Sequence, residues 1–342
     1  MKKNDCKIRL LKKDSIEEQI LVFNATFQDG RQYDEIRSKW ELKHYCNPLG
    51  ESLVFGAYVG DKLVGVKCYY PAEYICQSQR FSILVSCDSA VLPQYQGNGI
   101  WNTLIKYAID YIYKKTNYKT IISFPKPDTT YQGFKKMGWI TINQMNNYIY
   151  INNSSNFSKI LSKSVFLNAI SFLFDLQKIS VNLFDRLAKN YTVQECNPMD
   201  LLWAYDENSM HIHINENTLQ WKIQLQDLKS IAVYQNNKII ATCLYSIRPF
   251  SRQQILKIYH IASTGVQNMD ISILAKIITY LSKEYPECAY IRTWVAKESR
   301  MNKIYKKLLF LQFVQTNPFV INCKEDCEFP NVWDVSMFDL DY

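Results

Sequence analysis

Two glycines separated by one residue stand in the part of the chain best suited to binding an anion. Residues 93–100 (Pro-Gln-Tyr-Gln-Gly-Asn-Gly-Ile) follow a β-rich run and precede apolar residues at helical spacing. The first amides of a helix have no internal acceptors, and the helix dipole adds partial positive charge there. Glycine at positions 97 and 99 lets the backbone turn its amides toward a phosphate without a Cβ in the way. The segment therefore predicts a phosphate-binding turn.

Two other phosphate loops do not fit these residues. A Walker loop ends in Gly-Lys-Ser or Gly-Lys-Thr, which this segment lacks. A dinucleotide-binding loop needs a third glycine and a ribose-binding acid about 20 residues further on. For the loop taken alone, an ordinary tight turn between a strand and a helix remains the alternative.

The elements around the loop predict a mixed α/β arrangement. Gly60-Asp61-Lys62 lies between two β-rich runs and predicts a hairpin, and apolar residues at 100, 104, 108 and 112 predict an amphipathic helix. The expected order is a hairpin (52–59 and 63–70), a strand (81–92), a helix (99–115), a strand (118–124), a short helix (129–137) and a final strand to Tyr150.

The second half of the chain repeats this order. It contains an expected hairpin (231–234 and 239–247), a strand (255–262), a helix (271–281), a strand (290–295) and a helix (300–309). The length of 342 residues also favours two domains over one. We therefore predict a domain over 1–150, a helical connecting segment over 151–218 and a second copy over 219–342.

The loop and its surroundings resemble the GNAT superfamily of acyl-CoA N-acyltransferases. Its signature, Gln/Arg-x-x-Gly-x-Gly/Ala after a strand, is met by Gln94, Gly97 and Gly99. Residues 134–139 (Phe-Lys-Lys-Met-Gly-Trp) resemble the Tyr/Phe-x-Lys-x-Gly-Phe/Trp ending of the same fold. The resemblance covers about residues 50–150, and the two-copy layout is similar to bacterial tandem GNAT proteins, some of which are encoded with surface-polysaccharide genes. It implies an α/β (α+β) fold of two tandem GNAT-like mixed-sheet domains.

The resemblance also implies a co-substrate, acetyl-CoA, and the backbone that binds it. In the family the pantetheine arm pairs with a strand at the positions of Ala90 and Val91, where an amide also polarises the thioester carbonyl. The residues whose amides hold the pyrophosphate correspond to Gln96, Gly97, Asn98, Gly99 and Ile100. No metal is expected.

The acid and base of an acyl transfer are predicted from single residues. An amine with a pKa near 10 must lose a proton before it attacks, so a base is needed. Asp88, near the end of the central strand, is the first candidate, and Glu73 is an alternative. Many family members have a tyrosine at the position of Phe134 to protonate the leaving thiolate. Tyr131, one turn earlier, is the candidate substitute, with a packing role as its alternative.

The second copy lacks the features of a cofactor loop. Residues 263–270 (Ser-Thr-Gly-Val-Gln-Asn-Met-Asp) have no paired glycines, and Asp270 places a negative charge where a phosphate would bind. We therefore expect the second copy to be degenerate and not to bind CoA.

Composition narrows the class of protein further. The net charge is +8, but acids are interspersed among the bases, so a nucleic-acid partner is not expected. No apolar stretch reaches the length of a membrane span, and the N-terminus has no apolar signal core. Ten scattered cysteines fit reduced thiols in the cytoplasm, and a zinc site at Cys323 and Cys327 is not favoured. The sequence does not set the oligomeric state, nor whether residues 155–190 contact a membrane.

The main hypothesis is a cytoplasmic, acetyl-CoA-dependent N-acetyltransferase acting on an amine such as an amino sugar of a surface polysaccharide. One alternative is a tRNA-dependent aminoacyl transferase of the peptidoglycan-bridge type, which also pairs two GNAT-like copies but has no functional CoA loop. Another is a non-catalytic CoA-binding protein.

Overall fold

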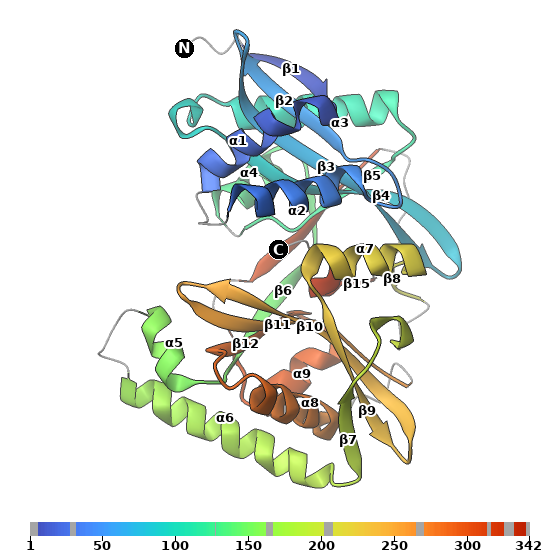
Figure 1. The fold of residues 1–342 in the computed structure, drawn as a ribbon. Helices are drawn as coiled ribbons and strands as arrows, with labels where there is room; N and C mark the ends of the chain where they lie inside the picture. Colours follow the sequence, from blue (N-terminus) through green and yellow to red (C-terminus); the bar gives the residue numbers. More distant parts are fainter. Residues whose placement is uncertain are drawn as a thin grey trace. The chain divides into compact units, whose positions relative to one another are not determined.

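A computed structural model describes residues 6–27, 32–126, 128–161, 167–201, 208–264, 270–312, 316–324 and 332–339. The chain divides into two compact units, and each unit is built from segments that lie far apart in the sequence. Unit 1 comprises residues 1–142, 212–221 and 318–331, and unit 2 comprises residues 143–211, 222–317 and 332–342. The fold is mixed α/β, as predicted (Figure 1).

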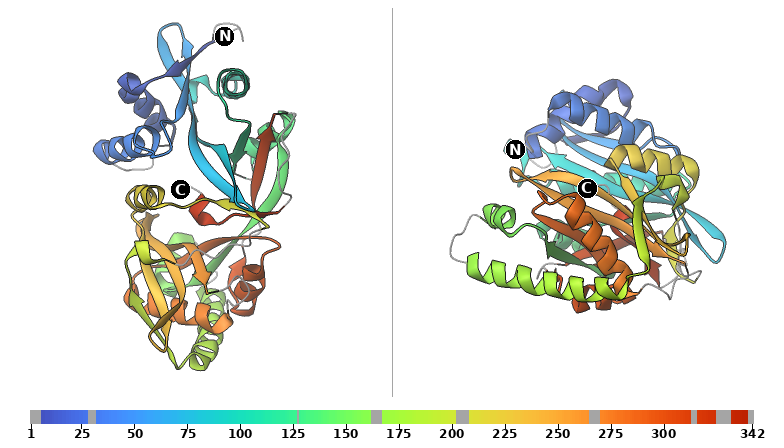
Figure 2. Two further views of the ribbon diagram at one scale, coloured as in Figure 1. Left: turned by 90° about the vertical axis from the view of Figure 1, so that its right-hand side faces the viewer. Right: turned by 60° about the horizontal axis from the view of Figure 1, so that its bottom comes forward.

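Unit 1 contains a twisted sheet in the order β1-β2-β3-β4-β5-β14. Its strands are β1 (Cys6–Leu11), β2 (Leu53–Val59), β3 (Lys62–Cys76), β4 (Gln79–Val91), β5 (Thr120–Ser123) and β14 (Asn317–Cys323). Its helices are α1 (Ile16–Phe27), α2 (Tyr33–Tyr45), α3 (Ile100–Lys115) and α4 (Thr129–Lys136). Helices α1 and α2 lie on one face of this sheet and α3 lies on the other (Figure 2).

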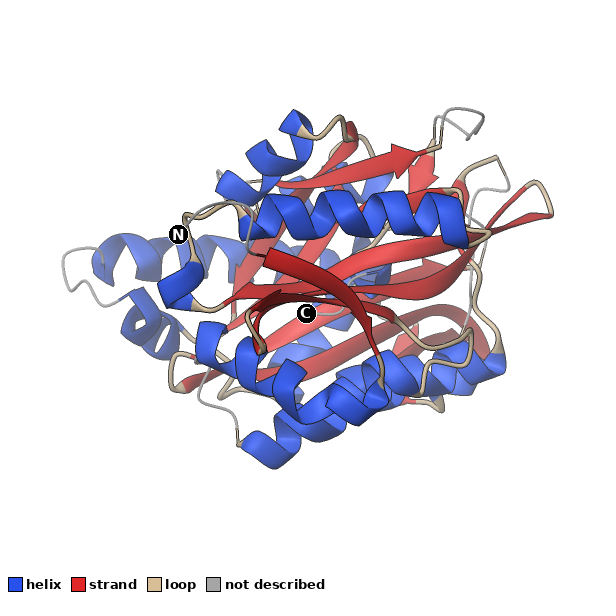
Figure 3. Ribbon diagram, turned by 90° about the horizontal axis from the view of Figure 1, so that it is seen from above, coloured by secondary structure: helices blue, strands red, loops and turns tan. Residues whose placement is uncertain are grey.

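Unit 2 has a sheet in the order β6-β12-β11-β10-β9-β7, and β13 also pairs with β6. Its strands are β6 (Ile140–Ile151), β7 (Tyr191–Glu195), β9 (Lys229–Gln235), β10 (Lys238–Phe250), β11 (Gln253–Ser263), β12 (Tyr290–Ala296) and β13 (Leu311–Gln312). Its helices are α5 (Ser154–Leu161), α6 (Leu167–Leu187), α8 (Ile271–Glu284) and α9 (Arg300–Lys307). The remaining short elements are β8 (Met210–Ile212), β15 (Trp333–Asp334) and α7 (Glu216–Gln226). Figure 3 shows all these elements coloured by type.

Each unit receives one strand from the other half of the chain. The strand that follows α4, β6, pairs antiparallel with β12 in unit 2, from Ile151↔Tyr290 to Met145↔Ala296. The strand near the C-terminus, β14, pairs antiparallel with β5 in unit 1 through Val320↔Ser123 and its neighbours. Both units therefore contain exchanged strands, whereas the predicted boundaries at 150 and 218 follow the sequence. The contact-defined units thus differ from the expected borders because distant strands pair, and the domain borders themselves stay a prediction.

Burial explains why these segments fold as they do. On α3, the side chains of Leu104, Ile105, Ala108 and Ile112 are fully buried, which is the apolar face that the spacing predicted. The predicted hairpins, the central strands and the helices in both halves are present within a few residues of the expected ranges. The hairpin of β3 and β4 is longer than expected, because β3 continues through Pro71 to Cys76. In the part of the chain that the structure describes, no helix is long and apolar enough to cross a membrane.

Candidate active site at the bulge of β4

The central strand β4 carries a β-bulge at Asp88. Lys67 pairs with Ser89 and Cys68 pairs with Cys87, so Asp88 has no partner in β3. Its φ is +34°, in the left-handed region that is uncommon for a residue other than glycine. Strained residues of this kind cost free energy and concentrate at functional sites. The local geometry therefore marks the position that the sequence singled out as the candidate base.

Strands β4 and β5 separate close to this bulge. Their parallel pairing runs from Leu84↔Ile121 to Ser86↔Ser123 and stops there. Residues 87–91 of β4 therefore have an edge without a paired β5 residue. An extended ligand can add to such an edge through its own amides.

The two predicted pantetheine contacts, Ala90 and Val91, face opposite ways. The amide of Leu92 donates to the carbonyl of Val64 at 2.9 Å, and antiparallel ladders alternate, so Ala90 also points its backbone groups toward β3. Val91 consequently faces the open edge, where its carbonyl accepts from Gln96 Nε2 at 2.9 Å and from Thr26 Oγ1 at 3.3 Å. The amide of Val91 is the group suited to a ligand.

The predicted phosphate turn lies directly after this edge. Gly97 and Gly99 have φ of +76° and +75°, and Gly99 is the N-cap of α3 without a side-chain cap. The Asn98 amide group reaches back to the carbonyls of Tyr95 and Gln96 at 3.3 and 3.2 Å and so braces the turn. Among the residues that the structure describes, no protein acceptor is hydrogen-bonded to the backbone amides of residues 97–102. A Cβ added at Gly97 would meet no atom within 4 Å, so the turn leaves open space for a pyrophosphate.

Several polar and charged side chains lie close to Asp88. Together with Asp88 itself we call them the bulge cluster, which comprises Lys43, His44, Lys67, Cys87 and Asp88. Lys43 Nζ lies 2.6 Å from Asp88 Oδ2, and His44 Nε2 lies 3.1 Å from the same oxygen. The imidazole of His44 is fully buried, and its Nδ1 lies 2.9 Å from the hydroxyl of Ser52. The ammonium of Lys67 donates to the carbonyl of Cys87 at 2.8 Å, next to the bulge.

Burial and charge act in opposite directions on this cluster. Burial alone would raise the pKa of Asp88, but the Lys43 ammonium and the contact with His44 outweigh it and hold that pKa below its ordinary range. Burial lowers the pKa of Lys67, which has no carboxylate at ion-pair distance among the described residues. Asp88 is therefore a permanently ionised carboxylate at neutral pH. Such a group accepts a proton weakly.

The cluster is a poor metal site. His44, Cys87 and Asp88 offer ligand atoms within 4.8 Å of one another. However, Lys43 already neutralises the Asp88 carboxylate, and Lys67 adds a second positive charge nearby. A divalent cation would have to displace the first and tolerate the second, so we assign no metal to these residues.

The other predicted acid-base residues contact partners that do not belong to the bulge cluster. The hydroxyl of Tyr131 is 2.9 Å from that of Thr141, so it has a local partner, and its role as an acid stays a prediction. The Oε2 atom of Glu73 lies 3.3 Å from Nη1 of Arg80 and 3.5 Å from Nε2 of His213. Phe134 is buried, with its ring centroid 5.4 Å from that of Trp101.

The corresponding positions in unit 2 are closed. Tyr259 takes the bulge position in β11, because Leu244 pairs with His260 and Tyr245 with Ile258. The Asp270 carboxylate accepts from the amide of Ser272 at 3.3 Å and so caps α8, the helix that corresponds to α3. Residues 265–269 of the predicted degenerate loop lie outside the described part of the chain.

The edge of β12 in unit 2 is also occupied by the protein itself. Val295 forms an antiparallel bridge with Ser336, from the segment after β15. A cavity of about 210 Å³ remains there, with Tyr259, Tyr305 and Ser336 among its lining residues. The chain itself thus takes the position that is open beside β4.

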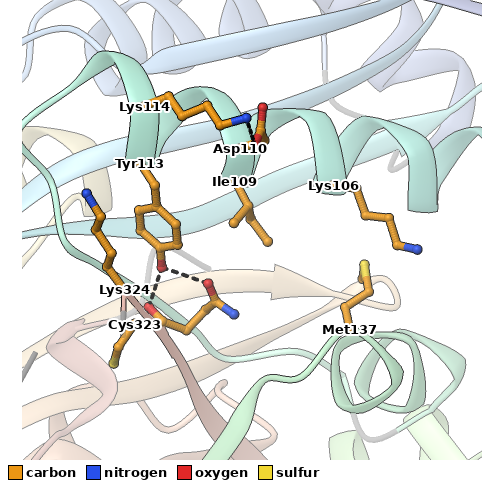
Figure 4. Close-up of a pocket in the computed structure, with 9 residues that line it drawn as sticks. Lys106, Ile109, Asp110, Tyr113, Lys114, Met137, Cys323 and Lys324 are labelled. Atoms are coloured by element: carbon orange, nitrogen blue, oxygen red, sulfur yellow. Dashed lines mark hydrogen bonds and ion pairs between the residues drawn. The ribbon is translucent and has the colours of Figure 1, made fainter. Parts of the chain in front are cut away.

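A larger cavity in unit 1, about 550 Å³, does not coincide with the candidate site (Figure 4). Lys106 and Tyr113 of α3 and Asn322 of β14 line it, and the Tyr113 hydroxyl donates to the Asn322 carbonyl at 2.9 Å. It lies along the end of the sheet where β14 pairs with the first residue of β5, Thr120. None of its lining residues belongs to the bulge cluster or the phosphate turn.

The residue pattern indicated Asp88 and the turn but not Lys43, His44 or Lys67. Lys67 had a recognisable signal, since it is the single charge in the apolar run 63–70. Lys43 and His44 had none, because only the packing of α2 brings them to a residue more than 40 positions away.

Comparison with known proteins agrees with this geometry. Residues 7–142 match the model of the acetyltransferase (GNAT) domain family. A search of curated proteins gave no match. The open edge of β4 and the uncapped turn both lie within the matched residues. Residues 7–142 therefore resemble a domain of the GNAT family.

Solved structures resemble the chain over most of its length. A GCN5-related N-acetyltransferase from Anabaena variabilis has a TM-score of 0.59 at 11% identity, covering 93% of this chain and 72% of that one. A probable N-acyltransferase from Enterococcus faecalis has a TM-score of 0.63 at 11% identity and the same coverage. Saccharomyces cerevisiae N-myristoyltransferase with bound myristoyl-CoA has a TM-score of 0.57 at 10% identity, covering 93% and 82%. At these identities the resemblance supports the fold alone.

Proposed function

We propose that the protein transfers an acetyl group from acetyl-CoA to a primary amine, at the end of β4. One observation carries the proposal: an open strand edge leads directly into a helix N-terminus whose amides have no acceptor among the described residues. An acyl-CoA needs both features, since its pantetheine arm is an extended amide chain and its pyrophosphate is an anion.

Different backbone amides at this end of β4 bind different parts of the acyl-CoA. The amides of residues 97–102 hold the pyrophosphate, and the amide of Val91 donates to the thioester carbonyl as it gains negative charge. A donor in that position contributes about 3 kcal/mol to an acyl-transfer transition state. The neutral amine nitrogen forms a bond to the acyl carbon while the carbon–sulfur bond breaks. CoA leaves as a thiolate, and the nitrogen, now bonded to the acyl carbon, releases one proton to water.

Asp88 is the group that we assign to the amine. Lys43 and His44 contact its carboxylate through Oδ2, and in this proposal the carboxylate accepts a hydrogen bond from the amine and so orients it. The amine loses its proton to water before attack, because a carboxylate with a lowered pKa does not retain it. Tyr131 remains our candidate for the group that protonates the thiolate.

An amino sugar of a surface polysaccharide is the acceptor class that we favour. The tandem second copy does not bind CoA in this proposal. The scattered spacing of the cysteines supports a cytoplasmic location.

The low pKa of the Asp88 carboxylate also favours a second candidate function, that of a non-catalytic protein. Because Lys43 and His44 hold the pKa of Asp88 low, the protein lacks a strong base in the bulge cluster. A non-catalytic acyl-CoA-binding protein would retain the turn and need no base. Its signature is tight acetyl-CoA binding without transfer to any amine.

Substitutions that introduce a negative charge test whether the turn at Gly97 and Gly99 binds the pyrophosphate. Gly97→Asp and Gly99→Asp place a carboxylate and a Cβ in the anion site, so we expect acetyl-CoA affinity in isothermal titration to fall by about 100-fold or more. The matched control is Gly138→Asp, since Gly138 also has a positive φ of +83° and open space around it. Affinity unaffected by the first two substitutions would refute the site, whereas binding without transfer across an amine panel would select the non-catalytic function.

A further inference from the structure

Helix α6 in unit 2 carries an exposed apolar row on one side. Phe172, Ile179, Leu183 and Leu187 are 63%, 64%, 58% and 72% exposed, and we call these four residues the α6 row. Their spacing of seven, four and four residues places them along one stripe of the helix. Large apolar side chains gathered in this way mark an interaction surface more often than scattered ones do.

The opposite side of α6 is fully used in packing. Gln177 Nε2 donates to the carbonyls of Ile149 and Leu309 at 3.2 and 2.9 Å, and Val181 is buried against the core of unit 2. Figure 1 shows α8 and α9 on this one side of α6. The helix is therefore held in place, and its outward stripe does not serve the core.

Positive charges accompany the row. Lys178, Arg186 and Lys189 are exposed beside it, against the single exposed acid Asp175 in this helix. The other acid, Asp185, is half-buried and lies 3.6 Å from Lys276. An apolar stripe bordered by cations is the pattern of a helix that lies in the interface of an anionic bilayer.

A second copy of the chain fits this face less well. Pairing two α6 helices would bring three exposed cations of one copy against three of the other, with only Asp175 to offset them in each. An anionic lipid surface complements the same charges. We propose that α6 docks unit 2 on an anionic membrane surface, with Phe172, Ile179, Leu183 and Leu187 at the boundary between headgroups and acyl chains.

Vesicle binding tests the docking surface. The full-length protein is sedimented with phosphatidylcholine vesicles that contain about 30 mol% phosphatidylglycerol, roughly the anionic fraction of a charged leaflet. We expect binding that weakens with salt, and a drop of about ten-fold or more in the Ile179→Asp/Leu183→Asp variant. The matched control is Leu21→Asp/Ile140→Asp, two positions that are each 59% exposed elsewhere in the chain.

The possible results of these experiments either support membrane docking through α6 or overturn it. No binding to anionic vesicles, equal binding to neutral ones, or equal loss in both double variants overturns the proposal. A dimer that the α6 variant dissociates in analytical ultracentrifugation assigns the face to a second copy instead. Acetyl-CoA titration without vesicles separates this proposal from the proposed function, because the α6 variant should bind acetyl-CoA as the unmodified protein does.

Discussion

Asp88 combines a strained backbone with a charge that two neighbours compensate. Its φ of +34° costs free energy, and Lys43 and His44 of α2 approach its carboxylate from the face of β4 that α2 covers. A residue that only ended a strand would need neither feature. The bulge turns one side chain out of the pleat, and the Lys43 ammonium together with the His44 contact keeps it ionised.

The replacement Asp88→Asn tests both roles of this residue. Breaking a buried ion pair leaves Lys43 uncompensated, so we expect a loss of about 3 kcal/mol in unfolding free energy at pH 7 and a 100-fold or larger drop in acetyl transfer. Because the folded pKa of Asp88 is lowered, its stabilisation is complete above the unfolded pKa near 4 and is lost as the pH falls below it. The stability difference between the two proteins should therefore shrink on acidification, as urea titrations at several pH values would show.

The exposed pair of Lys114 and Asp110 supplies the control. Its side chains are 69% and 60% exposed at a separation of 2.7 Å, so Asp110→Asn should change stability by less than about 0.5 kcal/mol. If both substitutions have the same small effect, Asp88 has no special role in the fold.

At the scale of elements, the exchanged strand β14 completes the sheet of unit 1. It pairs with β5 from Val320↔Ser123 to Cys323↔Thr120, and Tyr113 of α3 fixes its end. The hydroxyl of Tyr113 donates to the carbonyl and to Oδ1 of Asn322, at 2.9 and 2.7 Å. A helix from the first half of the chain thus anchors a strand from the second half.

The Tyr113→Phe variant measures this anchor. Removing one hydroxyl should cost about 1 kcal/mol and speed hydrogen exchange at the amides of β14 and β5. Tyr107→Phe is the control on the same helix, because Tyr107 is 42% exposed and should tolerate the change. Equal exchange rates in the two variants would show that the hydroxyl does not hold β14.

The local elements could be predicted from sequence and the strand exchange could not. The turn at Gly97 and Gly99 and the helix after it follow from residue types within a short window, and both lie where expected. The partner of β5 depends on a choice between two strands of similar character, β6 and β14, far apart in the chain. Likewise, Asp88 was found from its position at a strand end, but the lysine and histidine that set its pKa come from α2.

At the scale of the molecule, the two units have similar element orders and unlike sites. Unit 1 leaves an uncapped helix and an open edge, whereas in unit 2 Asp270 caps α8 and Ser336 bridges Val295 of β12. Within the described residues, the second unit therefore retains the arrangement of elements, but its helix start and the edge of β12 are occupied by the protein itself.

One acetyl-CoA should bind per chain. Titration of the unmodified protein should saturate at one equivalent, and Gly97→Asp/Gly99→Asp should abolish the heat without revealing weaker binding in unit 2. The physical reason is that the Asp270 carboxylate repels a phosphate and already accepts from the first turn of α8. Two equivalents, or residual binding in the variant, would assign a second site to unit 2.

The exchange of β14 also constrains how the chain is made. The sheet of unit 1 lacks its strand beside β5 until residues 317–323 have left the ribosome. At the usual pace of synthesis, the nascent N-terminal half waits roughly ten seconds or longer after β5 emerges. During that wait the edge of β5 is available to wrong partners, and a fragment that stops at residue 150 would keep it so permanently. Expressing the whole chain is thus a condition for completing the sheet of unit 1.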